Sequence, residues 1–279
     1  MKLMFNIPTF RFFTLVSLPL LTFSLTSCKV DETQQLEARS WALTWSDEFD
    51  GPAGQSPNTD NWAYDIGTGD NGWGNGEFQY YTDRKENVSL DGEGHLVLTA
   101  RRETFAGANF TSARITTKGS FSQAYGRFEA NIKTPYGPGL WPAFWMLGED
   151  IDEVGWPQCG EIDIMEMRGQ QPYIVHGTVH GPGYSAGAAI TSSYSLENSR
   201  FDTDFHLYAV EWYPDRIDFF VDDFLYKRIT PEDVTGEWVY DQPFFLILNV
   251  AVGGTFVGFP TSQTPFPQTM VVDYVKVYK

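Results

Sequence analysis

Three carboxylates fall within six residues in the run GEIDIMEM, at Glu161, Asp163 and Glu166. The apolar and β-branched residues between them predict a buried strand, where an ionised side chain is costly. Alternate side chains of a strand share a face, so Glu161 and Asp163 point together and Glu166 would point away. A β-bulge at 164–165 would return Glu166 to the same face. We therefore expect all three acids to line one cleft.

Two acids held close together acquire different pKa values, because burial and like charge keep one protonated while the other ionises. This division suits cleavage of a glycosidic bond, in which one acid attacks and the other donates a proton. Retaining glycosidases hold these carboxyls about 5–5.5 Å apart, and Glu161 and Glu166 can approach that range with a third acid nearby. A cation site or a solvated cluster on an edge strand are the alternatives. The flanking apolar residues favour catalysis.

The segment LWPAFWML at 140–147 predicts a strand that lies just before the acidic one. Trp141, Ala143 and Trp145 share one of its faces, so two indoles flank a small residue. Sugar rings pack on flat aromatic surfaces while their hydroxyls need polar neighbours. Both tryptophans could instead lie in the core, but their closeness to the acidic strand favours a polysaccharide cleft.

The run EIDIME resembles the signature of glycoside hydrolase family 16, and the inserted Met165 resembles the family's bulged, laminarinase-like branch. The segment WPAFW similarly resembles the Trp-Pro-x-x-Trp segment of that family. By this resemblance Glu161 is the nucleophile and Asp163 assists it. Glu166 is then the general acid, which becomes the base when water hydrolyses the glycosyl-enzyme intermediate. The order of these roles comes from the resemblance and not from the spacing.

Four further residues resemble positions that line the cleft in laminarinase-like members of the family: Asn75 in GNGEFQYYT, Arg114 in TSARI, His180 in HGTVHG and Asn249 in LNVAVGG. His176 and His180 are four residues apart, so on a strand they share a face and could imitate a metal-binding pair. We favour sugar binding for His180, because no cysteine or third histidine supplies the remaining ligands.

Residues 41–279 predict one catalytic domain without an internal linker or repeat. Aromatic and β-branched runs alternate with Gly, Pro, Asn and Asp, and they predict strands that include 95–100, 126–133, 207–212 and 244–252. The last of these is apolar on both faces apart from Asn249. The family resemblance implies an all-β fold, a two-sheet antiparallel β-sandwich (jelly roll) with the substrate across a concave cleft.

The N-terminus predicts export. Residues 1–27 carry two basic residues and then a long uncharged apolar run, which is typical of a secretory signal and short for a membrane span. The sequence LTSC resembles a bacterial lipoprotein cleavage box, which implies lipidation of Cys28 and makes 28–40 a tether. An ordinary signal peptide is the alternative. We expect an extracytoplasmic protein anchored by lipid to a bacterial membrane, at the outer membrane or cell surface. Cys159 then has no disulfide partner.

The formal net charge is −17, and loss of Lys2 and Arg11 with the signal segment takes it to −19. This charge argues against nucleic acid as a partner and mildly favours a neutral glucan over sulfated galactans. We expect a monomer that needs no cofactor for catalysis.

The segments WSDEFD and DYVKV resemble the family's terminal strands, which often share a structural calcium ion. Carboxylate and carbonyl oxygens suit Ca²⁺. The candidates are Glu48, Asp273 and the carbonyl of Gly92. Salt bridges or solvated acids are the alternative for these residues.

Taken together, the resemblance implies a retaining endo-glycosidase that cleaves β-1,3-glucan of laminarin type. The same acids could act on mixed-linkage β-glucan, agar or carrageenan, because loops set the sugar subsites. A non-catalytic surface glycan-binding lipoprotein would be expected to lack one of the acids, and all three are present. A transglycosylase would differ only in whether sugar or water resolves the intermediate, which the sequence does not decide.

Overall fold

The structure is a computed structural model in which residues 40–279 are described. The predicted signal segment, the lipidation site Cys28 and all but the last residue of the predicted tether lie outside these residues and stay predictions. Within the described part, no helix is both long and apolar enough to cross a membrane.

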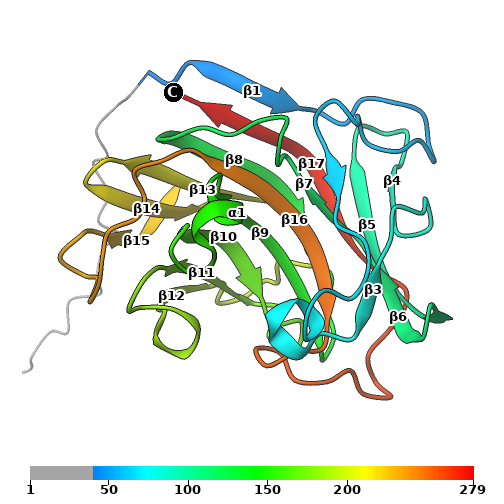
Figure 1. Ribbon diagram of the computed structural model, residues 1–279. Coiled ribbons are helices and arrows are strands. Elements are labelled where there is room, and N and C mark those ends of the chain that lie inside the picture. Colours follow the sequence, from blue (N-terminus) through cyan, green and yellow to red (C-terminus); the bar gives the residue numbers. More distant parts are fainter. Residues whose placement is uncertain (1–39) are drawn as a thin grey trace, which may run out of the picture. The chain divides into compact units, whose positions relative to one another are not determined.

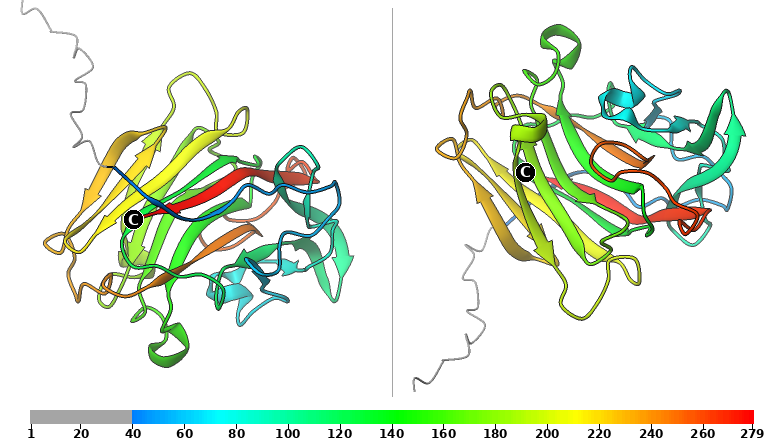
Figure 2. Two further views of the ribbon diagram at one scale, coloured as in Figure 1. Left: turned by 90° about the horizontal axis from the view of Figure 1, so that it is seen from above. Right: turned by 90° about the horizontal axis from the view of Figure 1, so that it is seen from below.

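Two β-sheets account for most of the domain, and they lie face to face (Figures 1 and 2). The larger sheet has ten strands in the order β15-β14-β13-β8-β17-β5-β6-β3, with β1 beside β17 and β4 beside β5. Its strands are β1 (Leu43–Asp47), β3 (Gln79–Tyr81), β4 (Val88–Leu90), β5 (Leu96–Phe105), β6 (Ala108–Ser112), β8 (Gly126–Lys133), β13 (His206–Tyr213), β14 (Arg216–Val221), β15 (Phe224–Ile229) and β17 (Gln268–Tyr278).

The smaller sheet has seven strands in the order β12-β11-β10-β9-β16-β7-β2. These strands are β2 (Ala63–Tyr64), β7 (Arg114–Thr116), β9 (Leu140–Gly148), β10 (Glu161–Met167), β11 (Ile174–His180), β12 (Ile190–Ser195) and β16 (Phe244–Val252). Helical segments in the described residues are short: η1 (Gly72–Gly76), α1 (Ile151–Val154) and η2 (Ala186–Ala188). The predicted all-β sandwich is confirmed.

One pairing departs from the antiparallel expectation. β3 pairs with β6 in parallel, with Gln79 opposite Phe110. Two further strands, β4 and β5, lie between β3 and β6 in the sequence, and a connection of that length permits a parallel pair. The segment just before β3 lies beside β16 of the smaller sheet, where the Phe78 N–H donates to the Val252 carbonyl at 2.8 Å.

The core lies between the sheets and is formed by side chains that alternate inward along the strands. β16 is the most deeply placed strand, because all nine of its residues are buried. It was predicted to be apolar on both faces, and Asn249 is its one polar residue. Such a strand is held on both faces, which makes it a rigid support for a site.

Candidate active site

The three acids lie on β10, and the strand carries the predicted bulge. Asp163 pairs with Trp145 of β9, but the next pairs along that ladder are Met165 with Phe144 and Glu166 with Ala143. The ladder with β11 is also interrupted between Asp163 and Glu166. Because of this extra residue, Ile164 and Met165 both contribute to the core. Glu166 therefore returns to the face that Glu161 and Asp163 occupy.

β10 lies inside its sheet, between β9 and β11, so the acids are not a solvated cluster on an edge strand. Asp163 is only 3% exposed and Glu166 9%. Directly paired residues of adjacent antiparallel strands share a face. One such row crosses the sheet through Arg114, Asn249, Ala143, Glu166 and His176. The small Ala143 leaves space beside Glu166 on this face.

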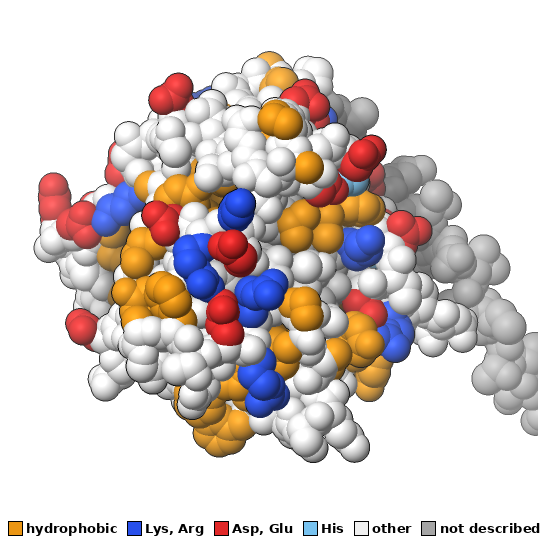
Figure 3. Space-filling model, turned by 90° about the vertical axis from the view of Figure 1, so that its right-hand side faces the viewer, with side chains coloured by type: hydrophobic (Ala, Val, Ile, Leu, Met, Phe, Trp, Pro, Cys, Tyr) orange, Lys and Arg blue, Asp and Glu red, His pale blue; other side chains and the backbone are white. Residues whose placement is uncertain are grey.

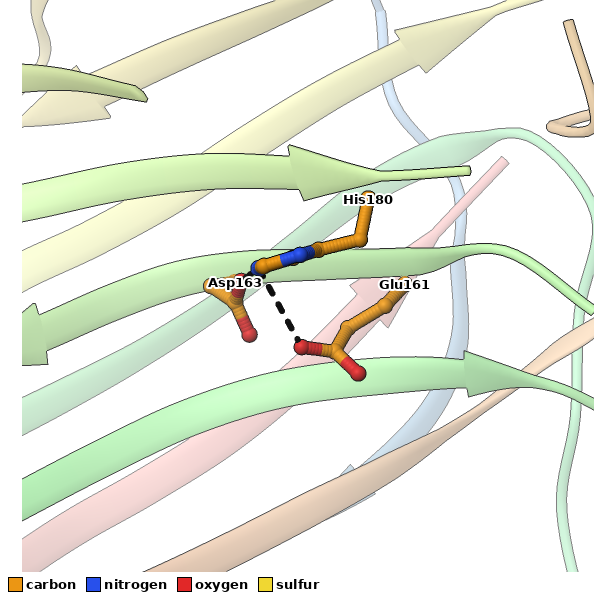
Figure 4. A group of neighbouring side chains, drawn as sticks. All are labelled: Glu161, Asp163 and His180. Carbon is orange, nitrogen blue, oxygen red and sulfur yellow. Dashed lines mark ion pairs between the residues drawn. The ribbon is translucent and has the colours of Figure 1, made fainter. Parts of the chain in front are cut away.

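His180 of β11 stands over the first two acids, and Figure 4 shows its ring pointing at both. Its Nε2 atom lies 3.2 Å from Oδ2 of Asp163 and 3.5 Å from Oε1 of Glu161. The other oxygen of Glu161 accepts a hydrogen bond from the indole N–H of Trp156 at 2.9 Å. Both carboxylate oxygens of Glu161 are thus oriented by neighbouring side chains.

The same three residues, Glu161, Asp163 and His180, offer ligand atoms within 4.8 Å of one another, so a metal site must be considered. The backbone N–H of Ala186 donates to Nδ1 of His180 at 3.1 Å, which assigns the ring proton to Nε2. A metal bound at Nε2 would need that proton on Nδ1, where it would face the Ala186 N–H. The arrangement therefore suits proton sharing with the acids better than metal binding.

Burial is the largest cause of the raised pKa values of the three acids. It raises the pKa of Glu161 to about 8, and the charge of Asp163 adds to the rise. Burial and then the charge of Glu166 raise the pKa of Asp163 well above its usual value. The pKa of Glu166 is also raised, mainly by burial, although the Trp141 hydrogen bond opposes the rise. Three such acids cannot all be ionised together, so the cluster retains a proton at neutral pH.

Asp163 is the acid best suited to hold that proton. It is the least exposed of the three, and burial followed by the charge of Glu166 raises its pKa well above the usual value. When Asp163 is protonated, the charge that most disfavours ionisation of Glu161 after burial is removed. Glu161 can then carry negative charge while it accepts the hydrogen bond from Trp156. This is the state that a nucleophilic carboxylate requires.

Glu166 lies among donors of a different kind. The indole N–H of Trp141 donates to its Oε1 atom at 2.9 Å, and the hydroxyl of Thr178 donates to Oε2 at 3.3 Å. Its raised pKa favours the protonated form, which is what a general acid needs. The strand thus carries two acids with separate hydrogen-bond surroundings.

A hydrogen-bonded wall continues from Trp145. Its indole N–H donates to Oδ1 of Asn249 at 2.7 Å, and the Asn249 amide donates to the Tyr81 hydroxyl at 3.1 Å. That hydroxyl donates to Glu77, which also accepts from Asn75. The predicted residues Trp145, Asn249 and Asn75 are therefore brought together by one chain of hydrogen bonds.

The guanidinium group of Arg114 packs against two indole rings, one of which belongs to Trp145 of this wall. Its Cζ atom lies 4.8 Å from the ring centre of Trp145 and 4.5 Å from that of Trp73, while Asp65 balances its charge at 2.7 Å. A fixed guanidinium beside indole rings suits sugar hydroxyls next to sugar faces. These flat rings, amides and charges form the lining expected of a polysaccharide cleft.

Comparison with known proteins decides the family. Residues 75–276 match the sequence family described as "Glycosyl hydrolases family 16". The chain belongs to glycosyl hydrolase family 16. It is 44% identical over 252 residues to a beta-glucanase of Rhodothermus marinus, with 87% of each chain covered. It is 38% identical over 260 residues to a glucan endo-1,3-beta-glucosidase of Cryptopygus antarcticus, which covers 85% of this chain and 92% of that protein.

A solved structure supports the same assignment. The laminarinase catalytic domain from Thermotoga maritima superimposes with a TM-score of 0.81 at 47% identity, and the match covers 86% of this chain and 99% of that one. The family 16 fold therefore extends over nearly the whole described domain.

Some residues of this family 16 site were not predicted from the sequence. Trp156 lies in the loop after α1, where no strand periodicity places its side chain. Glu77 is close to the predicted Asn75, but its contacts with Gln79, Asn75 and Tyr81 depend on the pairing of β3. The run GNGEFQ contained the signal for Glu77, since a carboxylate in a glycine-rich loop is well placed to contact a ligand.

The candidate calcium ligands have other partners. Oε1 of Glu48 lies 3.1 Å from Nζ of Lys276, and Oδ2 of Asp273 accepts from the Asn131 amide at 2.9 Å. Gly92 lies in a turn with φ of +87°. A calcium ion at Glu48 would have to displace the lysine ammonium, so these residues fit the ion poorly as they stand. The calcium site stays a prediction.

Cys159 packs in the interior of the domain. It is free and fully buried in a small cluster with Leu147, Phe245 and Ile247. Burial raises the pKa of its thiol to about 11, so the nucleophilic thiolate is not formed near neutral pH. The cysteine serves packing.

Basic side chains occur on the surface despite the negative net charge. On the side of the domain that Figure 3 presents, basic and acidic side chains lie among apolar ones. In and near β5, Arg84 and Arg101 pair with Glu103, and Arg102 stacks on Phe110. These three arginines are therefore committed to neighbours within the fold.

Proposed function

We propose that the protein is an endo-acting β-1,3-glucanase of laminarin type that retains the configuration of the sugar. The observation that carries the proposal is the bulged strand β10, which presents Glu161, Asp163 and Glu166 on one face. The family 16 relatives described above, a beta-glucanase, an endo-1,3-beta-glucosidase and a laminarinase, support the linkage.

In the first step the Glu161 carboxylate attacks the anomeric carbon and forms an ester bond to it. The bond from that carbon to the glycosidic oxygen breaks, and Glu166 gives its proton to the departing oxygen. Trp156 orients the nucleophile by donating a hydrogen bond to it. Two buried acids with different surroundings make this division of roles workable.

In the second step the Glu166 carboxylate removes a proton from water, and the water oxygen attacks the anomeric carbon. The ester bond breaks and Glu161 leaves as a carboxylate. Two displacements at one carbon restore the original configuration. A sugar hydroxyl in place of water would give transglycosylation by the same steps, so the balance of the two outcomes depends on the neighbouring sugar sites.

The substrate assignment is tested by incubating the protein with unbranched β-1,3-glucan, laminarin, mixed-linkage β-glucan, agarose and carrageenan. Products are measured by size and by the configuration of the newly formed reducing end. Short β-1,3-linked oligosaccharides released early with β configuration support the proposal. Cleavage of another polysaccharide alone would keep the mechanism and replace the substrate. Binding of β-glucan without cleavage would favour a glycan-capture lipoprotein.

We further propose that the protein acts outside the cytoplasm, held to a bacterial membrane by a lipid on Cys28. The sequence LTSC and the apolar segment before it support this location. Incorporation of labelled palmitate into the wild-type chain, and its loss in Cys28→Ala, is the expected result. Release of an unlabelled wild-type protein into the medium would show an ordinary signal peptide instead.

A further inference from the structure

Two buried polar atoms beside Glu166 have no hydrogen-bond partner among residues 40–279. They are Nε2 of His176 and Nε of Arg168. A buried polar group without a partner is costly, so two at one place suggest that a partner is bound during function. Neither atom takes part in the catalytic steps described above.

Strand register places both residues next to the general acid. His176 pairs directly with Glu166 across β10 and β11, so the two side chains share the cleft face. Arg168 follows the last residue of β10, and its charge acts on both Glu166 and His176. Neither residue contributes to the wall of Trp145, Asn249 and Asn75 described above.

Phe256 covers this pair. Its ring centre lies 4.3 Å from Cζ of Arg168 and 5.5 Å from the His176 ring, which meets it edge-on at 80°. Trp141, the hydrogen-bond donor to Glu166, packs against the same phenylalanine at 5.1 Å. The residue lies between Gly254 and Gly258, both with positive φ (+118° and +71°). These glycines give the loop backbone conformations that other residues rarely adopt.

The His176 imidazole and the Arg168 guanidinium can form the hydrogen bonds that sugar hydroxyls need. Burial, and then the charge of Arg168, lowers the pKa of His176 to about 4, so the ring is neutral near pH 7. A neutral imidazole offers one donor and one acceptor, as a hydroxyl does, while the guanidinium offers donors only. The indole ring of Trp141 adds the flat apolar surface that a pyranose ring prefers.

We propose that His176 and Arg168 bind the glucosyl unit on the leaving side of the scissile bond, and that Phe256 moves aside to admit it. The general acid protonates the oxygen that belongs to the leaving sugar, so that sugar must lie against Glu166. The same site receives the water or sugar acceptor in the second step. This inference rests on the proposed glycosidase function and specifies its leaving-group side.

The test compares two substrates with the same sugar on the nucleophile side. One is a laminari-oligosaccharide, whose leaving group is a sugar, and the other is the corresponding 4-nitrophenyl β-glycoside. Nitrophenolate departs without a proton and has no hydroxyls to bind. Full-length His176→Leu and Arg168→Met are expected to lose about tenfold or more in kcat/KM on the oligosaccharide, the effect of roughly one lost hydrogen bond, and less than about twofold on the glycoside.

Ser193→Ala is the matched control, because Ser193 is the next residue after His176 on the same cross-strand row but is exposed. It is expected to leave both substrates unaffected. Equal losses on both substrates in the His176 and Arg168 variants would show an effect on Glu166 or on folding, and would overturn the inference. Unchanged rates on both would overturn it too. Failure of the wild type to cleave either substrate would refute the proposed function instead.

Discussion

The indole N–H of Trp141 donates a hydrogen bond to Oε1 of Glu166 at 2.9 Å, and the indole N–H of Trp145 donates to Asn249 at 2.7 Å. The two tryptophans share one face of β9, yet they serve different partners. Trp141 contacts Glu166, the proposed general acid, whereas Trp145 contacts Asn249. Substitution of Trp141 should therefore affect proton transfer, and substitution of Trp145 should affect sugar binding.

Trp141→Phe is expected to move the alkaline limb of kcat/KM to higher pH by about one unit. The N–H stabilises the Glu166 carboxylate, so its loss raises the pKa of that acid and keeps it protonated at higher pH. Trp145→Phe is the matched control, and it should weaken binding without moving the limb. The measurement is a pH profile on one oligosaccharide. A downward shift in Trp141→Phe, or the same shift in both variants, would contradict this assignment.

Glu161→Gln is expected to unfold at a higher temperature than the wild type at pH 8 and at nearly the same temperature at pH 4.5. The folded-state pKa of Glu161 is raised to about 8, so the folded protein binds a proton more tightly than the unfolded chain. The free energy of unfolding therefore falls as pH rises from the unfolded pKa towards about 8. A neutral amide does not titrate, so the variant keeps its free energy of unfolding as pH rises, but it loses activity because the nucleophile is gone. The melting temperatures of both proteins are measured by calorimetry at both pH values. An equal gain in stability at pH 4.5 and pH 8 would contradict the raised pKa of Glu161.

Insertion of one alanine between Met165 and Glu166 is expected to abolish hydrolysis. The bulge accommodates one extra residue, so with the bulge retained a second extra residue turns Glu166 towards the core, where a carboxylate is costly. We expect a lower melting temperature as well. Met165→Leu keeps the chain length and the apolar side chain, and it should remain active. Activity in the insertion variant, with a folded circular dichroism spectrum, would show that the strand register does not position the acid.

Calcium removal tests the site predicted at Glu48, Gly92 and Asp273. If the ion displaces Lys276 from Glu48, a chelator should lower the melting temperature, because a ligand that binds only the folded state stabilises it. Asp273→Asn should then show a lower melting temperature and little further response to the chelator. An unchanged melting temperature in the wild type, with no calcium detected in the protein, would remove the site and leave the Glu48–Lys276 ion pair.

The bulge was predictable because the sequence itself breaks its pattern. Apolar and acidic residues alternate from Glu161 to Ile164, and then Met165 shifts the third acid by one position. An ionised group facing the core would cost more than a local break in pairing, so a bulge was the less costly solution. The shared face of Trp141 and Trp145 followed from the same period of two.

Other parts of the site could not be read from periodicity. Trp156 reaches Glu161 from a loop after a one-turn helix, and loop conformation depends on contacts that the local sequence does not encode. The parallel pairing of β3 with β6 is a long-range choice of the whole sheet, and it helps to position Glu77. Likewise, Phe256 meets His176 because the loop after β16 folds against β11, which is a long-range contact.

The central claim is that Glu161 attacks the sugar and Glu166 moves the proton. Azide rescue of Glu161→Ala and Glu166→Ala with an aryl β-laminari-oligosaccharide tests this most directly. In Glu161→Ala, azide should enter the space left by the nucleophile and give the α-glycosyl azide. In Glu166→Ala the glycosyl-enzyme still forms, and azide should attack it to give the β-glycosyl azide. The opposite pair of products, or the same anomer from both variants, would contradict the account.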